Sequence, residues 1–430
     1  MVRGKYATLA VALLLAASTR AVPPLPESDS RVHEGVASCA SSVCHGKVSQ
    51  DSDSTVWLNE SRVWLRQDYH SRAYRTLQTE QSQSIARKLG LPSAAGAKIC
   101  LDCHADNVSG DFRGNRFQIS DGVGCEACHG GSQNWLKSHA EAGTSHADNV
   151  ANGMYPTEQP AARAELCLSC HLGTKDKFAT HRIMGAGHPR LAFELETFTV
   201  NQPAHYGVDD DYKLRKPYTD SVRMWLIGMA ISARESAELL QSPLFLSESL
   251  VPELSFFQCH DCHHPMDQLR WAPEGSPSLA PGAVRLNDGP LLVLIDALAV
   301  IDVAASDALE QQLWALHSAS QRSRADVVKS AAALELALQK VSDTLSDVSL
   351  GRSDYLALRT SLLARAGAGG YRHFTAAEQA FLAVETLSLM LEDDARIAAP
   401  LDAWFETLAD ENDFLPQLFA SRARQVRAAL

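Results

Sequence analysis

Long apolar runs are absent from this 430-residue sequence beyond residue 21, and basic residues are fewer than acidic ones. A helix that spans a bilayer needs about 20 consecutive apolar residues, so the mature chain is not expected to cross a membrane. Lysine and arginine number 39 against 51 aspartates and glutamates, which gives a formal net charge of −12. Such a surface repels nucleic acid and anionic lipid, and it favours basic docking partners.

The first residues have the composition of a secretory signal. A basic start with Arg3 and Lys5 is followed by the apolar stretch 7–17 and then by small residues up to residue 21. This pattern is typical of a cleavable signal peptide over residues 1–21, with an uncleaved membrane anchor as the alternative. No cysteine stands directly after the cleavage position, so a lipoprotein anchor is not indicated. We therefore expect a periplasmic or secreted protein in which residues 22–32 form a flexible, proline-rich lead.

Cysteine is absent after Cys262, and the ten cysteines before that point are closely grouped. They form five pairs, and a histidine directly follows the second cysteine of each pair. Disulfides or zinc ribbons would not need that histidine. The form Cys-x-x-Cys-His is typical of c-type haem attachment, in which two thiols bond to the porphyrin and the histidine binds the iron. Four pairs have this form: Cys100, Cys103 and His104; Cys125, Cys128 and His129; Cys167, Cys170 and His171; Cys259, Cys262 and His263.

The first pair departs from the pattern. Four residues separate Cys39 from Cys44, and His45 follows. A longer spacer can loop out between two haem-attachment cysteines, whereas a short-loop disulfide is the alternative. We predict five covalently attached haem c groups, or four if Cys39 and Cys44 form a disulfide.

Histidines other than the proximal five are concentrated in the same region. Of the 16 histidines, eight non-proximal ones lie between His70 and His264. Low-spin haems usually have two strong axial ligands, so this surplus predicts distal ligation. The predicted distal ligands are His70, His139, His188, His205 and His264. His146 competes with His139, and His181 and His260 are held in reserve, with Met184 or Met266 as ligands only where a histidine is missing.

The sequence predicts a mainly α fold in two parts. Residues 33–271 form a pentahaem cytochrome c domain with short helices and long loops, in which residues 220–241 make one clear amphipathic helix. The proline- and glycine-rich segment 272–285 is a linker. Residues 286–430 lack cysteine and have apolar residues at helical spacing, which predicts an antiparallel helical bundle. Its expected helices include residues 326–346, 353–366, 375–391 and 415–429, with a capping box at Thr375 and Glu378.

Three stretches resemble the multihaem cytochromes of the cytochrome c-554 type, which are related in haem arrangement to hydroxylamine oxidoreductase and pentahaem nitrite reductase. They are residues 122–130, residues 181–195 and residues 259–265. The likeness covers roughly residues 35–275. It implies closely packed parallel and perpendicular haem pairs, mostly bis-histidine ligation, and electron transfer between periplasmic redox proteins. The resemblance also implies that His188 is a distal ligand.

This sequence lacks two features of the enzymes among these relatives. Pentahaem nitrite reductases have a Cys-x-x-Cys-Lys motif, which this sequence lacks. The cross-linking tyrosine of hydroxylamine oxidoreductases has no recognisable counterpart. We therefore favour an electron carrier that serves periplasmic or membrane redox proteins. The alternative is an oxidoreductase that acts on a small nitrogen or sulfur compound at one five-coordinate haem.

A third hypothesis concerns assembly. The chain could be a subunit of a filament or a respiratory complex, in which a surplus histidine such as His33 ligates a haem of a neighbouring copy. The helical bundle would then be a docking or oligomerisation platform, and a homo-oligomer is left open. No nucleic acid is expected as a partner.

Overall fold

Helices joined by loops make up this protein, as the sequence predicts. The computed structural model describes residues 23–49, 56–246, 251–263, 279–280, 282–392 and 395–430. Within these residues β structure is limited to two isolated bridges, His33 with Arg113 and Phe257 with Leu286. None of the helices in these ranges is long and apolar enough to span a membrane. The predicted signal segment and most of the predicted linker lie outside the described residues.

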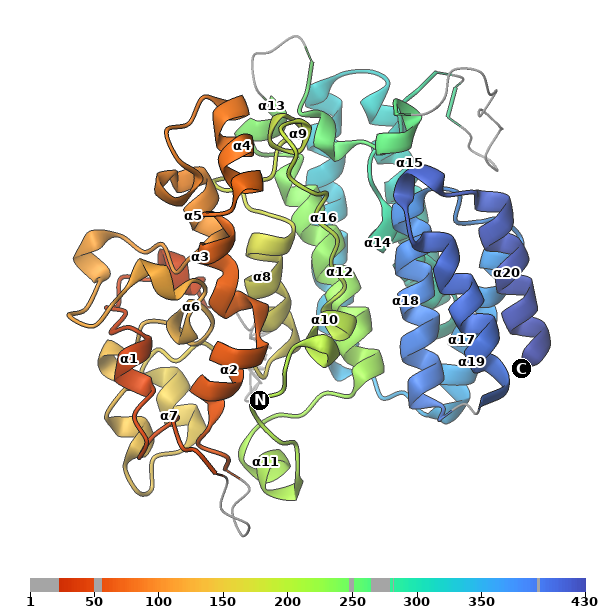
Figure 1. The fold of residues 1–430 in the computed structure, drawn as a ribbon. Helices are drawn as coiled ribbons and strands as arrows, with labels where there is room; N and C mark the ends of the chain where they lie inside the picture. Colours follow the sequence, from red (N-terminus) through yellow and green to blue (C-terminus); the bar gives the residue numbers. More distant parts are fainter. Residues whose placement is uncertain (1–22, 50–55, 247–250, 264–278, 281, 393–394) are drawn as a thin grey trace, which may run out of the picture.

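Short helices fill the N-terminal half, shown in red to yellow in Figure 1. Many begin at a polar cap; the hydroxyl of Thr79, for example, accepts a hydrogen bond from the backbone N–H of Ser82 at the start of α4. That helix ends at Gly90, whose φ of 76° suits glycine best. The helices are α1 (Val36–Cys39), α2 (Glu60–Gln67), α3 (Ala73–Thr76), α4 (Glu80–Leu89), α5 (Lys98–His104), α6 (Cys125–His129), α7 (His146–Ala151), α8 (Pro160–His171), α9 (His181–Gly185), α10 (Leu195–Asn201) and α11 (Asp210–Arg215).

A long buried helix stands in the middle of the molecule (Figure 1). Helix α12 (Ser221–Leu239) agrees with the prediction over residues 220–241, and the Asp220 carboxylate caps it by accepting a hydrogen bond from Arg223 N–H at 3.0 Å. Trp225 and Leu226 are completely buried. The helix packs on α8 and α10 of the N-terminal part and on α14, α16 and α18 of the C-terminal part. A short helix, α13 (Pro243–Leu246), follows it.

The C-terminal third is a bundle of long helices, shown in teal to blue in Figure 1. Neighbouring pairs along the chain pack together, namely α14 with α15, α15 with α16 and α17 with α18, while α20 packs on α17 and α19. Short loops between such pairs are typical of antiparallel neighbours. The helices are α14 (Gly289–Ile301), α15 (Val303–Ser320), α16 (Arg324–Asp347), α17 (Arg352–Gly367), α18 (Phe374–Met390), α19 (Ala395–Phe405) and α20 (Pro416–Ala429).

Two details of the bundle differ from the predictions. The capping box is wrong, because α18 already begins at Phe374 and Thr375 lies within its first turn. The Thr375 hydroxyl instead donates to the Asn287 side chain at 3.0 Å, and Glu378 binds the guanidinium of Arg190. Helix α19 was not predicted, since it contains Pro400, a residue that usually interrupts a helix.

A single cluster of buried apolar residues extends from α8 through α12 into the bundle. It includes Leu168 of α8, Leu226 of α12 and Leu338 of α16, each at most 2% exposed. The two predicted domains, residues 33–271 and residues 286–430, therefore share one hydrophobic core. The division into domains stays a prediction.

Candidate haem-binding site

A large cavity lies in the N-terminal half and has a volume of about 2230 Å³. Pockets for one small molecule are about 300–1,000 Å³ in size, so this space is larger than one ordinary ligand needs. Its walls carry the cysteines and histidines of the first four motifs. The motif residues in the wall are Cys39, Cys44, His45, Cys100, Cys103, His104, Cys125, Cys128, His129, Cys167, Cys170 and His171.

Local structure presents the motifs at the ends of short helices. Helix α6 consists of the third motif alone, whereas α5 and α8 end at His104 and His171. Each thiol pair therefore lies within one helical turn of its histidine. The first motif begins at Cys39, the last residue of α1, and the extra residues before Cys44 form a turn. The structure thus gives the expanded motif a looped spacer.

Every motif histidine has a second imidazole facing it at a similar distance. The ring centroids of the five pairs are between 6.0 and 6.4 Å apart. The pairs are His45 with His139 at 6.0 Å, His171 with His70 at 6.2 Å, His104 with His188 at 6.3 Å, His129 with His205 at 6.4 Å, and His263 with His181 at 6.0 Å.

This spacing fits a metal ion between two imidazoles. Bonds from a transition ion to imidazole nitrogen are about 2 Å long, so two rings on opposite sides of one ion have centroids roughly 6 Å apart. A direct ring stack would be closer than that. Among the described residues, no group of three or more His, Cys, Asp or Glu side chains is arranged to hold a bare metal ion. The histidines are therefore placed as pairs, which suits an iron whose other four ligands come from a porphyrin.

Hydrogen bonds at Nδ1 orient several of these rings. His45 Nδ1 donates to the Glu60 carboxylate at 2.9 Å, and His70 Nδ1 donates to Asp68 at 2.8 Å. His104, His139 and His188 donate to backbone carbonyl oxygens at 2.8 to 3.2 Å. A metal-binding histidine commonly uses one nitrogen in this way, which leaves Nε2 available for the metal.

Burial keeps four of the rings neutral. It lowers the pKa values of His104, His171 and His205, and it lowers the pKa of His129 to about 3, with a further contribution from His205. A metal ligand must be the neutral imidazole. His45 and His70 differ, because the hydrogen bonds to Glu60 and Asp68 raise their pKa values.

Cysteines from different motifs also meet. The thiol of Cys39 lies close enough to Cys125 for Cys125 to lower its pKa, and Cys170 likewise raises the pKa of Cys103. The first and third motifs are therefore neighbours, as are the second and fourth. Haem groups attached at neighbouring motifs would lie close together.

The fifth motif lies apart from this cavity and against the bundle. Gln258 N–H donates to Arg285 C=O at 2.8 Å, and Arg285 N–H donates to the Asp261 carboxylate at 2.8 Å. Cys262 is exposed. The predicted ligands His264 and Met266 lie outside the described residues, and the imidazole next to His263 is His181, which the sequence analysis held in reserve.

Other predicted histidines have different neighbours. His146 pairs with Glu158 at 3.0 Å, and the ring of His260 lies 6.5 Å from that of Phe374. His33 is completely buried and hydrogen-bonds to Asp106 at 2.8 Å. The idea that His33 ligates a haem of a neighbouring copy is therefore wrong, because the side chain does not reach the surface.

Sequence reasoning missed the carboxylates that support the site. Glu126, inside the third motif, is 2% exposed and accepts hydrogen bonds from the backbone N–H groups of Glu34, Gly35 and Ser132 at 2.7 to 2.9 Å. It ties the N-terminal segment to α6. Its position between two haem-attachment cysteines was the available signal, since a charged residue there has no role in attachment itself.

Comparison with known proteins agrees with this site. Residues 37–130, which hold the first three motifs, match the family of cytochrome c554 and c-prime. Comparisons with curated proteins and with solved structures give no match. The motifs and the paired histidines agree with this match over residues 37–130, which supports a c-type cytochrome that binds haem c covalently and transfers electrons.

Proposed function

We propose that the protein is a periplasmic or secreted carrier with five haem c groups, each ligated by two histidines. The five cysteine pairs, including Cys39 with Cys44, attach the groups, and the haem irons supply one-electron redox chemistry. The proposed axial pairs are His45 and His139, His104 and His188, His129 and His205, His171 and His70, and His263 and His181. Here His181 takes the place that the sequence analysis gave to His264.

The single observation that carries this proposal is the repeated spacing of the imidazole pairs. Five independent pairs of rings lie 6.0 to 6.4 Å apart, each with one motif histidine. With two histidines on each iron, no coordination position is left for a substrate. This favours electron transfer over catalysis at a five-coordinate haem.

Exposure of the outermost motifs supports exchange with partners. Cys44 and Cys262 are the two exposed cysteines, and they belong to the first and the last motif. Electrons can pass to another protein only where a redox group comes close to the surface. We propose that these two sites face periplasmic or membrane redox proteins, with basic docking surfaces complementary to the net charge of −12.

Intact mass and electron paramagnetic resonance of the purified oxidised protein test the haem count and the ligation. Five haems and an all-low-spin spectrum that does not respond to nitric oxide or hydroxylamine are expected. Four haems with a loss of two protons would mean a disulfide between Cys39 and Cys44. A native high-spin signal that responds to either ligand would support the oxidoreductase alternative instead.

A pair of variants tests the assignment at the fifth motif. His181→Ala should convert one haem to a high-spin form, because it removes the ring 6.0 Å from His263. The control is His260→Ala, whose ring lies beside Phe374. A fully low-spin spectrum in His181→Ala would show that a residue other than His181 is the ligand.

A further inference from the structure

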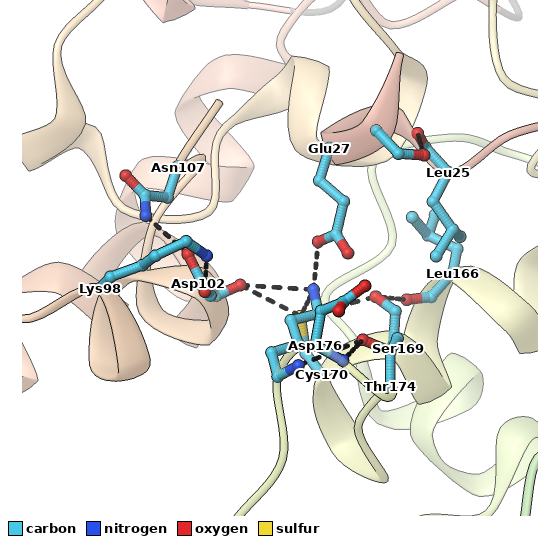
Figure 2. Close-up of polar contacts among 12 residues, drawn as sticks. Leu25, Glu27, Lys98, Asp102, Asn107, Leu166, Ser169, Cys170, Thr174 and Asp176 are labelled. Atoms are coloured by element: carbon cyan, nitrogen blue, oxygen red, sulfur yellow. Dashed lines mark hydrogen bonds and ion pairs between the residues drawn. The ribbon is translucent and has the colours of Figure 1, made fainter. Parts of the chain in front are cut away.

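A buried lysine lies between two of the haem-attachment motifs. The side chain of Lys177, in the loop that follows α8, is only 4% exposed. Its Nζ donates to the Asp102 carbonyl oxygen and to Cys170 Sγ, both at 3.3 Å, and it forms an ion pair with Glu27. Figure 2 shows Glu27, Asp102 and Cys170 converging from three separate segments of the chain.

The two motifs in contact with this lysine are the second and the fourth. Asp102 lies between the thiols Cys100 and Cys103, and Cys170 Sγ lies 4.0 Å from the Asp102 carbonyl oxygen. In the haem-bearing protein, Cys103 and Cys170 are the residues whose sulfur atoms bond to the porphyrins. The ammonium group therefore lies where the attachment edges of two haem sites meet.

Within the part of the chain that the structure describes, Glu27 is the one charged side chain that pairs directly with Lys177. It belongs to the 3₁₀ turn Pro26–Ser28, far from the lysine in sequence, and its carboxylate is partly exposed. The other two partners, a carbonyl oxygen and a sulfur, are uncharged once the cysteine is alkylated by haem. A buried ammonium group is costly unless it is paired. Glu27 offsets this cost, and the charge of the ammonium group acts on the groups that lie beside it.

We propose that Lys177 and Glu27 form a charge pair that sets the reduction potentials of the two haems attached at Cys100 and Cys103 and at Cys167 and Cys170. This rests on the proposed function, because it needs haem at both motifs. Reduction adds one electron to each iron, and a positive charge held nearby in a medium of low dielectric constant stabilises the reduced form. Lys177 raises both potentials, and Glu27 opposes it.

A structural role would have a different signature. The ion pair between Glu27 and Lys177 also joins the N-terminal segment to the loop after α8. Loss of either partner would remove this connection. A purely structural effect therefore predicts that both variants shift the potentials in the same direction. An electrostatic effect predicts opposite directions.

The experiment is a spectroelectrochemical titration of the full-length haem-bearing protein. Lys177→Met should shift the potentials of two haems in the negative direction, and Glu27→Gln should shift the same two in the positive direction. Lys177→Arg keeps the charge and should stay close to the unmodified protein. The matched control is Lys175→Met, in the same loop, whose side chain is 60% exposed and pairs with Asp176; it should leave all potentials unchanged.

Haem counting and spin state separate the two proposals. Shifts in the same direction in Lys177→Met and Glu27→Gln, or no shift in a protein that keeps five low-spin haems, would overturn the charge-pair proposal alone. Fewer than five haems or a high-spin iron in the unmodified protein would instead overturn the proposed function. Should Lys177→Met not assemble, Glu27→Gln decides alone, since a positive shift supports the proposal and the lack of one refutes it.

Discussion

Single carboxylates hold imidazole rings and backbone groups of this protein in place. Glu60 holds the ring of His45, Asp68 holds the ring of His70, and Glu126 gathers three backbone N–H groups. Glu126 is the acceptor for backbone groups that would otherwise be buried without a partner, which costs more than the bond itself contributes. The site is thus oriented by acids that do not themselves attach haem.

Glu126 offers the clearest test at this scale. Glu126→Ala leaves the N–H groups of Glu34, Gly35 and Ser132 without their acceptor in a buried place. Hydrogen bonds to a charged group contribute about 1.5–3 kcal/mol each, with strong non-additivity, so we expect a loss of roughly 3 kcal/mol in unfolding free energy. Urea unfolding of the haem-bearing protein measures it. Glu141→Ala, at an exposed position, is the control, and equal midpoints for the two variants would contradict this role.

The sequence predicts which residues belong to the site better than it predicts which two histidines face each other. The attachment cysteines are fixed by a local spacing rule, which is visible in sequence. Which imidazole faces which motif depends on contacts between distant segments. For example, His181 and His188 lie on one short stretch yet face the fifth and the second motif. His264 was predicted to bind a different haem from His263, and that prediction lies outside the described residues.

Among the elements, α14 begins at a buried cluster of charge. The Asp288 carboxylate accepts hydrogen bonds from Arg285 Nε at 3.0 Å and from His317 Nε2 at 2.9 Å, and all three residues are at most 6% exposed. Burial acts to raise the pKa of Asp288, but Arg285 and His317 outweigh it and hold the pKa well below its usual range. The same Arg285 backbone contacts Gln258 and Asp261, so the cluster also braces the fifth motif.

Asp288→Asn should therefore destabilise the bundle in a pH-dependent way. Removing one partner of a buried ion pair costs about 3–5 kcal/mol. Because the folded pKa is depressed, the stabilisation by Asp288 is fully present above the unfolded pKa of about 3.9 and is lost as pH falls through the folded pKa. Thermal unfolding at pH 7 and at pH 3 should show a smaller difference between variant and unmodified protein at pH 3. A difference independent of pH would rule out this carboxylate as the cause.

Close packing of α10 on α12 gives a second test at the scale of elements. A Cβ added at Gly228 would lie 2.5 Å from Leu195 Cβ, and Leu195 is 1% exposed. Overpacking of this kind costs about 1–3 kcal/mol. We expect Gly228→Ala to lower the thermal midpoint, whereas Gly110→Ala, where nothing lies within 4 Å of the added Cβ, should not. Unchanged midpoints in both would show that α10 moves freely.

The long helices were easier to predict than the short ones, for a physical reason. Helix α16 and helix α17 follow from apolar periodicity over several turns. Most helices of the N-terminal half last one or two turns, and their ends depend on side-chain caps and on contacts with distant segments. Helix α19 was missed because Pro400 normally argues against a helix, although the helix continues through it here.

For the molecule as a whole, α12 is the element that belongs to both halves. Its residues Val222, Trp225, Leu226 and Ala230 are completely buried. It packs on α8, whose last residues are the fourth attachment motif, and on α16 of the bundle. The fifth motif is likewise held by residues on the bundle side. The bundle therefore helps to position the haem-attachment motifs.

This arrangement predicts that the protein unfolds in one cooperative step. Exposing either half would expose the apolar surface of α12, at a cost of about 25 cal/mol for each Å². Soret absorbance reports on the haem sites and circular dichroism at 222 nm reports mainly on the long helices of the bundle, so the two signals should change at the same urea concentration. Coincident transitions are the test of two-state behaviour. A bundle that unfolds at clearly lower urea than the haem sites would contradict this prediction and would favour two independent domains with the boundary near residue 280.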